Sequence, residues 1–243
     1  MKIDLNCDLG EGLDNDESIM PYIASANIAC GMHAGDSQLM QKTVRLAKGF
    51  GVAVGAHPGW PDLQGFGRRE MSLGPDQVEA LVLDQIEVLA AIAKAEGVEL
   101  RHIKPHGALY NQAARDLTLA DAIARAIKGF SRDMILVGLA GSNLVDAGVA
   151  AGLHVLNEGF ADRNYNPDGT LVSRQQANAI IEAPQEVAAH ALALAVEGIF
   201  FGGRHITIET LCLHGDHAQA VENARLVRSE LETAGVQIAA PSK

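Results

Sequence analysis

Four histidines of this chain are each followed by glycine within two residues, in the stretches HAGD, HPG, HG and HGD that start at His33, His57, His106 and His214. An imidazole can gain or lose a proton near neutral pH and can bind a metal ion, so it suits acid–base chemistry. Glycine permits a positive φ and lets a ligand approach the backbone closely. Any one of these histidines could simply be hydrogen-bonded in a turn, but four with the same pattern favour one shared site.

A lysine and two carboxylates complete the candidate catalytic set. Lys104 precedes His106 in the stretch KPH, and we expect it to point inward from a strand, where burial and a nearby histidine lower its pKa. It would then act as an acid, a base or an electrostatic clamp, and the alternative is a lysine that extends from the rim into solvent. Asp8 and Glu11, with Asp4 on the same expected strand, offer carboxylates for general-base work, and Glu158 lies at the end of another expected strand. The predicted catalytic residues are therefore Asp8, His57, Lys104, His106 and Glu158.

The sequence leaves a bound divalent metal open. Asp8, His33 and His57 could supply the three nitrogen or oxygen ligands that such a site needs, and Glu11 is a further carboxylate nearby in the chain. No H-E-x-x-H or H-x-H pair strengthens this interpretation. A hydrogen-bond network among the same residues is the alternative.

Two arginine-bearing segments follow predicted strands and could hold an anionic substrate. The glycine-rich stretch GWPDLQGFGRR, residues 59–69, is predicted to be a mobile lid that brings Arg68 or Arg69 to a carboxylate or phosphate. The stretch EGFADRNYNPDGTLVSR, residues 158–174, adds Arg163 and several other polar side chains. The alternative is that these are ordinary surface arginines. With Asn27 and two of the histidines, the predicted substrate-binding residues are Asn27, His33, Arg68, Arg69, Arg163 and His214.

Short apolar runs alternate with longer runs of helical periodicity, which predicts repeated β–α units and a parallel sheet. The expected strands cover residues 2–8, 25–30, 52–57, 100–106, 134–139, 154–158 and 206–214. The expected helices run from Asp36 to Gly49 or Gly51, and over residues 74–96, 117–128, 143–151, 184–196 and 217–234. Asp36 and Asp216 are expected to cap the helices that follow them. No proline-rich or serine-rich linker divides the chain, so one domain over residues 1–243 is predicted.

Polar residues at the ends of different strands select between an open sheet and a closed barrel. Asp8, His57 and His214 each lie at or just past the C-terminal end of a different expected strand, as do Asn27, His106 and Glu158. In a β/α barrel such positions converge on one mouth, whereas an open sheet spreads most of them along an edge. The prediction is an α/β protein with a single-domain, seven-stranded, TIM-like (β/α) barrel.

Composition excludes several classes of partner. The chain has 19 Lys and Arg against 30 Asp and Glu, and the net charge of −11 would repel nucleic acid and anionic membranes. Three cysteines form no even disulfide framework, and the acidic start of the chain does not look like a signal peptide. No run of eighteen apolar residues is present. A cytoplasmic protein with neither nucleic-acid nor membrane partners is expected.

The sequence lacks two common motifs for nucleotide binding and nucleophilic catalysis. There is no G-x-x-x-x-G-K-[ST] loop to bind ATP phosphates and no G-x-S-x-G elbow. Cys7, Cys30 and Cys212 lie near strand ends, where a packing role is favoured over a nucleophilic one.

Six stretches, in this order, resemble the LamB/YcsF family over essentially the whole chain: DLNCDLGEG, SANIACGMHAGD, GAHPGWPDLQGFGRR, IKPHGALYN, EGFADRNYNPDGTLVSR and CLHGD. The resemblance implies a seven-stranded barrel similar to that of polysaccharide deacetylases. It also implies the activity of a 5-oxoprolinase A subunit, which opens 5-oxo-L-proline to L-glutamate with ATP hydrolysis and acts with B and C subunits. ATP would then be bound largely by those partners, which accounts for the missing nucleotide loop. Homo-oligomers are possible.

Roles follow from this resemblance as a hypothesis. Asp8, Glu158 or His57 would activate water, while Lys104 and His106 would stabilise charge on the reacting oxygen or protonate the ring nitrogen. One of the three arginines would hold the substrate carboxylate, and Asn27, His33 and His214 would line the pocket. Deacetylases use an Asp-His-His metal site with two spaced histidines after the second strand, but this chain has only one there, so their metal is not carried over. The alternatives are a metal-dependent amidohydrolase or deacetylase acting alone, and a non-catalytic substrate-binding accessory subunit.

Overall fold

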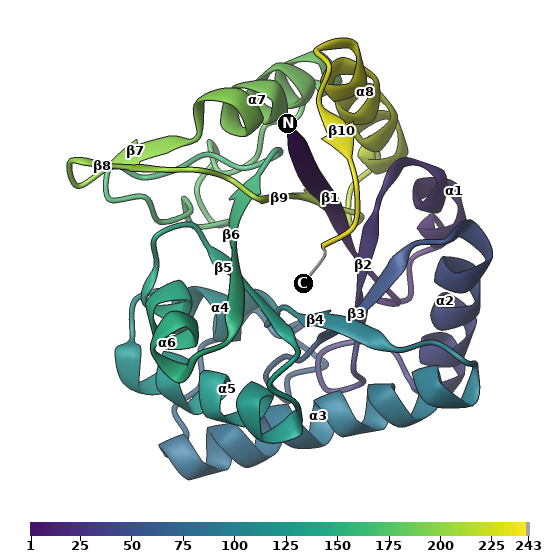
Figure 1. Cartoon of the computed structure of the whole chain (residues 1–243), viewed down its shortest axis with the longest axis vertical. Coiled ribbons are helices and arrows are strands. Elements are labelled where there is room, and N and C mark those ends of the chain that lie inside the picture. The colour runs from purple at the N-terminus through teal and green to yellow at the C-terminus, as the bar shows by residue number, and fades with distance from the viewer. Residues whose placement is uncertain (242–243) are drawn as a thin grey trace.

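Seven parallel strands close into a barrel in the computed structural model, which describes residues 1–241. The strands pair in the order β1-β2-β3-β4-β5-β6-β9, and β9 pairs again with β1, so the sheet has no free edge (Figure 1). Their bounds are β1 Lys2–Leu9, β2 Ser25–Ala29, β3 Ala53–His57, β4 Leu100–Ile103, β5 Ile135–Leu139, β6 His154–Phe160 and β9 Thr210–His214. The predicted seven-stranded barrel is confirmed.

Helices follow the strands and form the outer layer of the barrel (Figure 1). They are α2 Ser37–Phe50, α3 Pro75–Ala95, α5 Leu117–Phe130, α6 Asn143–Ala151, α7 Pro184–Glu197 and α8 Ala220–Thr233. The signals in the sequence explain their ends. Asp36 accepts a hydrogen bond from the Leu39 N–H at 2.9 Å and so caps α2, while Gly51 ends that helix with a φ of 70° that an L side chain rarely adopts. Among residues 1–241, no helix is long and apolar enough to cross a membrane.

Several shorter elements were not expected from the sequence. They are α1 Asp16–Ile19, the 3₁₀ helix η1 Met20–Tyr22, α4 Gly107–Ala113, and β10 Gln237–Ile238, which pairs with the start of β1. The expected fourth strand also ends early, at Ile103, so His106 occupies the N-cap position of α4. This places His106 in a strand-to-helix turn.

The expected last strand, residues 206–214, is wrong in its first half. Residues 204–206 form β8, Arg204–Ile206, which pairs antiparallel with β7, Ile199–Phe201, in a separate hairpin beside the barrel (Figure 1). Gly202 and Gly203 have φ values of 57° and 73° and supply the tight turn between these strands. Only Thr210–His214 joins the barrel. Local residue pattern predicts an extended backbone in both segments but not which strand each one pairs with.

Asp216 is not the helix cap that the sequence predicted. The last helix begins at Ala220, and Gln219 occupies its N-cap position. The Asp216 carboxylate instead accepts hydrogen bonds from Arg68 and Arg174, which belong to two other segments. A charged partner from elsewhere in the fold has therefore replaced a local capping interaction.

The barrel interior is polar along one face of β1. Asp4, Asn6 and Asp8 alternate with Leu5 and Cys7, and all five are buried. The three polar side chains form hydrogen bonds to side chains of other strands, whereas the apolar set belongs to the hydrophobic core that includes the helices. β1 therefore contributes at once to the core and to a buried polar network.

Candidate functional site

Asp4 and Asn6 join three strands at the base of the polar network. Ser25 and Thr210 donate hydroxyl hydrogen bonds to the Asp4 carboxylate at 2.6–2.8 Å. Asn6 donates to Thr210 Oγ1 at 2.7 Å and to Glu158 Oε1 at 3.0 Å. Burial raises the pKa of Asp4 to about 7, although both hydroxyl hydrogen bonds lower it. Asn6 was not among the residues predicted for the site; its period-two spacing with Asp4 and Asp8 is the signal that could have indicated a role.

Lys104 lies at the centre of the network, with a side chain that is 2 % exposed. Its Nζ lies 2.9 Å from both Asp8 Oδ1 and Glu158 Oε1, so one ammonium faces two carboxylates. Burial alone would lower the lysine pKa, but these carboxylates raise it well above its usual range. The expectation of a lowered pKa is therefore wrong, because the sequence does not reveal that two acids converge on this amine. Lys104 is held as an ammonium.

Asp8 is held as an anion by the same arrangement. Burial would raise the pKa of Asp8, but His57 and Lys104 lower it well below its usual range. Asn27 adds a hydrogen bond at 2.8 Å to Oδ1, and His57 Nε2 lies 3.3 Å from Oδ2. Asp8 is thus an anion whose Oδ1 contacts Lys104 and Asn27 and whose Oδ2 contacts His57.

Three histidines and Glu11 gather above Asp8. The His33 and His106 rings stack with centroids 3.7 Å apart, and the His57 and His106 rings meet edge to face at 4.8 Å. Glu11 Oε1 lies 3.3 Å from His33 Nε2 and 3.3 Å from His106 Nδ1. Burial lowers the pKa of His33 to about 3 and that of His106 well below its usual range, while burial and Asp8 raise the pKa of Glu11 to about 7.

Tyr110 is a site residue that the sequence interpretation missed. It lies on α4, and its hydroxyl donates a 2.6 Å hydrogen bond to Glu158 Oε2. Glu158 is fully buried and thus receives Tyr110, Asn6 and Lys104. Tyr110 follows His106 by four residues, one helical turn, and that spacing is the signal that could have identified it.

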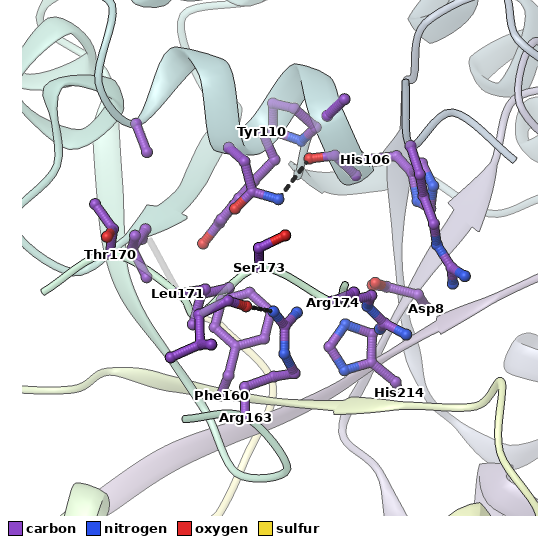
Figure 2. Close-up of a pocket in the computed structure, with 18 of the residues that line it drawn as sticks. Asp8, His106, Tyr110, Phe160, Arg163, Thr170, Leu171, Ser173, Arg174 and His214 are labelled. Carbon is purple, nitrogen blue, oxygen red and sulfur yellow. Dashed lines mark hydrogen bonds between the residues drawn. The ribbon is translucent and has the colours of Figure 1, made fainter. Parts of the chain in front are cut away.

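A cavity of about 600 Å³ opens above this network at the C-terminal ends of the strands. Its wall includes part of the segment 161–183, here called the cover segment, which follows β6 (Figure 2). Seven of the eleven predicted site residues line the cavity: Asp8, His57, Arg68, Lys104, His106, Arg163 and His214. The strand ends therefore meet at one mouth, as the barrel prediction required.

The other four predicted residues lie elsewhere. Three of them are buried and do not line the cavity: Glu158, Asn27 and His33. Each contacts a residue that does line it, namely Lys104, Asp8 and Glu11, respectively. Arg69 lies outside, with a side chain that is 63 % exposed and an ion pair to Asp62. Of the two neighbouring arginines, Arg68 lines the cavity and Arg69 does not.

The cations that line the cavity differ in their partners. Arg68 and Arg174 share Asp216, Arg115 pairs with Glu70, and Lys104 has two carboxylates. Arg163 is 4 % exposed and forms no ion pair with any carboxylate among residues 1–241. Its Nε and Nη2 instead donate to the backbone carbonyls of Ala179 and Val172, within the cover segment. Burial, and next Arg174, lower the pKa of Arg163 to about 10.

His214 completes the wall beside Arg174 and Asp8 (Figure 2). Its Nδ1 lies 2.9 Å from Asp162, whose carboxylate also accepts the His214 backbone N–H at 3.0 Å. This second carboxylate–imidazole pair fixes the ring at the cavity edge. In the sequence, Asp162 stood out only as part of a polar segment.

Two groups of side chains among the described residues could hold a metal ion. The first is Glu11, His33, His57 and His106, and the second is Asp8, Cys212 and His214. In the second group the Lys104 ammonium lies 2.9 Å from Asp8 Oδ1 and 3.0 Å from Cys212 Sγ, so a cation already occupies it. Neither group is the trio Asp8, His33 and His57 suggested by the sequence. Burial raises the thiol pKa of Cys212 well above its usual range, which agrees with a packing role.

Fold and site together define a β/α-barrel protein with an acid–base cavity at the C-terminal mouth of the barrel. The chain belongs to the LamB/YcsF family, because the sequence model of that family matches residues 3–243.

Relatives and solved structures agree with this assignment. The 5-oxoprolinase A subunit from Symbiobacterium thermophilum is 53% identical over 249 residues, which cover 99% of this chain and 95% of that protein. The 5-oxoprolinase A subunit from Pyrococcus furiosus is 49% identical over 247 residues, 98% of this chain and 97% of that one. The crystal structure of the lactam utilization protein from Thermus thermophilus has a TM-score of 0.90 and 46% identity, covering 99% and 100% of the two chains. A Bacillus cereus polysaccharide deacetylase, with a TM-score of 0.52 and 14% identity over 100% of this chain and 93% of its own, shares the fold alone.

Proposed function

We propose that this chain is the A subunit of an ATP-dependent 5-oxoprolinase and opens the lactam ring of 5-oxo-L-proline to give L-glutamate. The observation that carries the proposal is a cavity with a buried ammonium, a fixed carboxylate and imidazoles at its floor and one arginine without a carboxylate partner in its wall. Relatives about half identical in sequence that are named as the A subunit of 5-oxoprolinase, and the similar lactam utilization protein, support this substrate class.

A five-membered lactam resists hydrolysis because amide resonance stabilises it. In the proposed reaction, partner subunits B and C use ATP to phosphorylate the ring carbonyl oxygen, which makes its carbon a better electrophile. Water then adds to that carbon, the C–N bond breaks and the ring nitrogen takes a proton, which leaves the acyl phosphate of glutamate. A second water hydrolyses this acyl phosphate and releases glutamate and inorganic phosphate. This division of labour fits a chain whose sequence contains no G-x-x-x-x-G-K-[ST] loop.

The raised pKa of Lys104 assigns it a role as a permanent positive charge, not as a base. An ammonium at the cavity floor stabilises negative charge that develops on the carbonyl oxygen, and it does so best in a dry, preorganised site. Glu158 lies below the cavity and holds Lys104 in place as its counter-ion. Asp8 and His57, whose Oδ2 and Nε2 lie 3.3 Å apart, are the cavity groups that activate water, and the proton that they take up passes to the ring nitrogen.

Arg163 is the proposed partner of the substrate carboxylate. Two backbone carbonyls fix its guanidinium, and no carboxylate among residues 1–241 neutralises it. Arg68 and Arg174 already share Asp216, and Arg69 lies outside the cavity with Asp62. A substrate carboxylate therefore gains most from Arg163, because pairing there breaks no existing ion pair.

The experiment that tests the function is a reconstitution with the B and C subunits of the same organism. Glutamate formation that requires this chain, 5-oxoproline and ATP is the expected result. No glutamate above that formed by B and C alone would overturn the proposal, and so would deacetylase activity of the isolated chain with no lactam opening. If the chain only presents substrate, variants of Asp8 and His106 would lose binding in proportion to turnover, whereas a catalytic chain loses turnover with binding retained.

A further inference from the structure

Backbone carbonyls fix the hydrogen positions on two imidazoles of the site. His57 Nδ1 lies 2.7 Å from the Lys104 carbonyl oxygen, and His106 Nε2 lies 2.9 Å from the Phe66 carbonyl oxygen. A carbonyl oxygen only accepts hydrogen bonds, so both of these ring nitrogens carry a hydrogen. In neutral rings the remaining nitrogens, His57 Nε2 and His106 Nδ1, therefore each present a lone pair.

Those two lone pairs face each other at 2.9 Å. Carboxylate oxygens approach the same region, since Asp8 Oδ2 lies 3.3 Å from His57 Nε2 and Glu11 Oε1 lies 3.3 Å from His106 Nδ1. When both rings are neutral and both carboxylates are ionised, these four acceptor atoms have no hydrogen between them and repel one another, and all four residues are largely buried from water. A single proton shared among the four atoms satisfies only one of these contacts. A cation between them removes this repulsion.

The spacing of the donors fits a metal ion. Ion-to-donor distances of about 2.1 Å place neighbouring donors about 3.0 to 3.4 Å apart in octahedral or tetrahedral coordination. The separations of 2.9 Å between His57 and His106 and 3.3 Å between His106 and Glu11 lie close to this range, and ligand atoms of these three residues all lie within 4.8 Å of one another. Asp8 is not a member of that group, but its Oδ2 approaches from the His57 side at 3.3 Å. We propose that His57 Nε2, His106 Nδ1, Glu11 Oε1 and Asp8 Oδ2 form a binding site for one divalent transition metal ion of the zinc type.

Charge favours the same conclusion. Asp8, Glu11 and Glu158 bring three carboxylates to this buried region, and Lys104 supplies one ammonium. The three carboxylates and the ammonium together leave two negative charges. A divalent ion neutralises both, whereas a single proton leaves one negative charge uncompensated. Mixed imidazole and carboxylate donors suit zinc and its neighbours better than they suit calcium or magnesium.

His33 has a positioning role in this arrangement and is not a ligand. Its ring stacks on His106 with an interplanar angle of 4°, so lone pairs in the two ring planes run parallel and do not converge on one ion. His33 Nε2 instead contacts Glu11 Oε1 at 3.3 Å and can donate to it, which orients the carboxylate. Its buried Nδ1 then has no partner, as observed.

The four donors line the cavity, so a further coordination position would face the substrate space. When bound, such an ion would replace Asp8 and His57 as the group that activates water, because it would lower the pKa of a bound water, or it would polarise a carbonyl oxygen. That chemistry rests on the proposed lactam opening, whereas metal binding itself does not. The two claims can therefore fail separately.

Metal binding to the untagged, chelator-treated chain tests the inference. Titration with Zn²⁺ by calorimetry and with Co²⁺ by visible absorption should show one ion per chain. His57→Ala and His106→Ala should each weaken binding at least about 100-fold, and His33→Ala about 10-fold. The matched control His205→Ala, on the exposed β7–β8 hairpin, should leave affinity unchanged.

The Zn²⁺ stoichiometry and the Co²⁺ absorption spectrum of the wild-type chain show whether the metal site exists, even if a variant fails to fold. No ion bound above one-tenth stoichiometry, or equal binding by His57→Ala, His106→Ala and His205→Ala, overturns the metal site and leaves a shared proton between the two rings. Glutamate formation in the reconstituted system without a bound ion would reject the metal and keep the proposed function. Stoichiometric metal without lactam opening would do the reverse.

Discussion

Replacing Lys104 by methionine would remove the charge at the centre of the site while retaining most of its aliphatic volume. Asp8 and Glu158 would then remain buried and close to each other. They would lack the ammonium that lies 2.9 Å from each carboxylate in the wild type. Removal of one partner from a buried ion pair typically costs about 3 to 5 kcal/mol, because the desolvated charge that remains has no compensation. Since two carboxylates lose the same partner, we expect the upper part of that range.

Urea unfolding followed by circular dichroism at pH 7 measures this cost. Lys104→Met should lose about 4 to 5 kcal/mol of unfolding free energy. Glu158→Gln retains the Lys104–Asp8 pair and should lose less, about 1 to 3 kcal/mol. The double variant Lys104→Met/Glu158→Gln should be more stable than the sum of the single effects by at least about 1 kcal/mol, because it leaves one carboxylate unpaired and not two.

Additive effects in this cycle would refute the reasoning, as would a Lys104→Met chain whose stability lies within about 1 kcal/mol of the wild type. Either outcome would mean that the two carboxylates are not both ionised around a charged lysine. The same variants bear on catalysis. Loss of turnover in the double variant, measured where it is fully folded, would separate the electrostatic role of Lys104 from its contribution to stability.

Three further predictions concern the cavity wall, the barrel base and a turn of the site. Arg163→Gln should reduce the preference for 5-oxoproline over pyrrolidin-2-one, which lacks the carboxylate, by about 10- to 100-fold in kcat/KM; Arg69→Gln is the matched control, and equal effects of the two would contradict the assignment. Folded Asp4 has a pKa of about 7 against 3.8 in its unfolded reference, so its protonated form stabilises the fold and this stability falls as pH rises from about 4 to 7, by on the order of 4 kcal/mol. Asp4→Asn should therefore flatten the decline in unfolding free energy between pH 4 and 8, and an unchanged profile would count against the raised pKa. Gly67 has a φ of 64°, and an added Cβ would lie 2.7 Å from atoms of two site histidines, so Gly67→Ala should cost about 1 to 3 kcal/mol in a thermal melt; Gly49→Ala in α2, where a Cβ meets no atom within 4 Å, should be neutral or stabilising.

The sequence by itself determined the barrel and much of its mouth. Period-two and helical patterns, with local signals such as the Asp36 cap and Gly51, depend on neighbours a few residues away and can be recognised without the fold. Because parallel β–α units place every strand end at one side, seven of the predicted residues meet at the cavity.

Only the tertiary structure decided how these groups are paired. Asn6 and Thr210 are 204 positions apart, the ammonium of Lys104 meets carboxylates from two distant strands, and Arg69 turns away to Asp62. The direction of a pKa shift depends on such contacts and on burial, which no local pattern encodes. The tautomer of His106 likewise depends on a carbonyl 40 residues earlier in the chain, so the point where four acceptors converge became visible only in three dimensions.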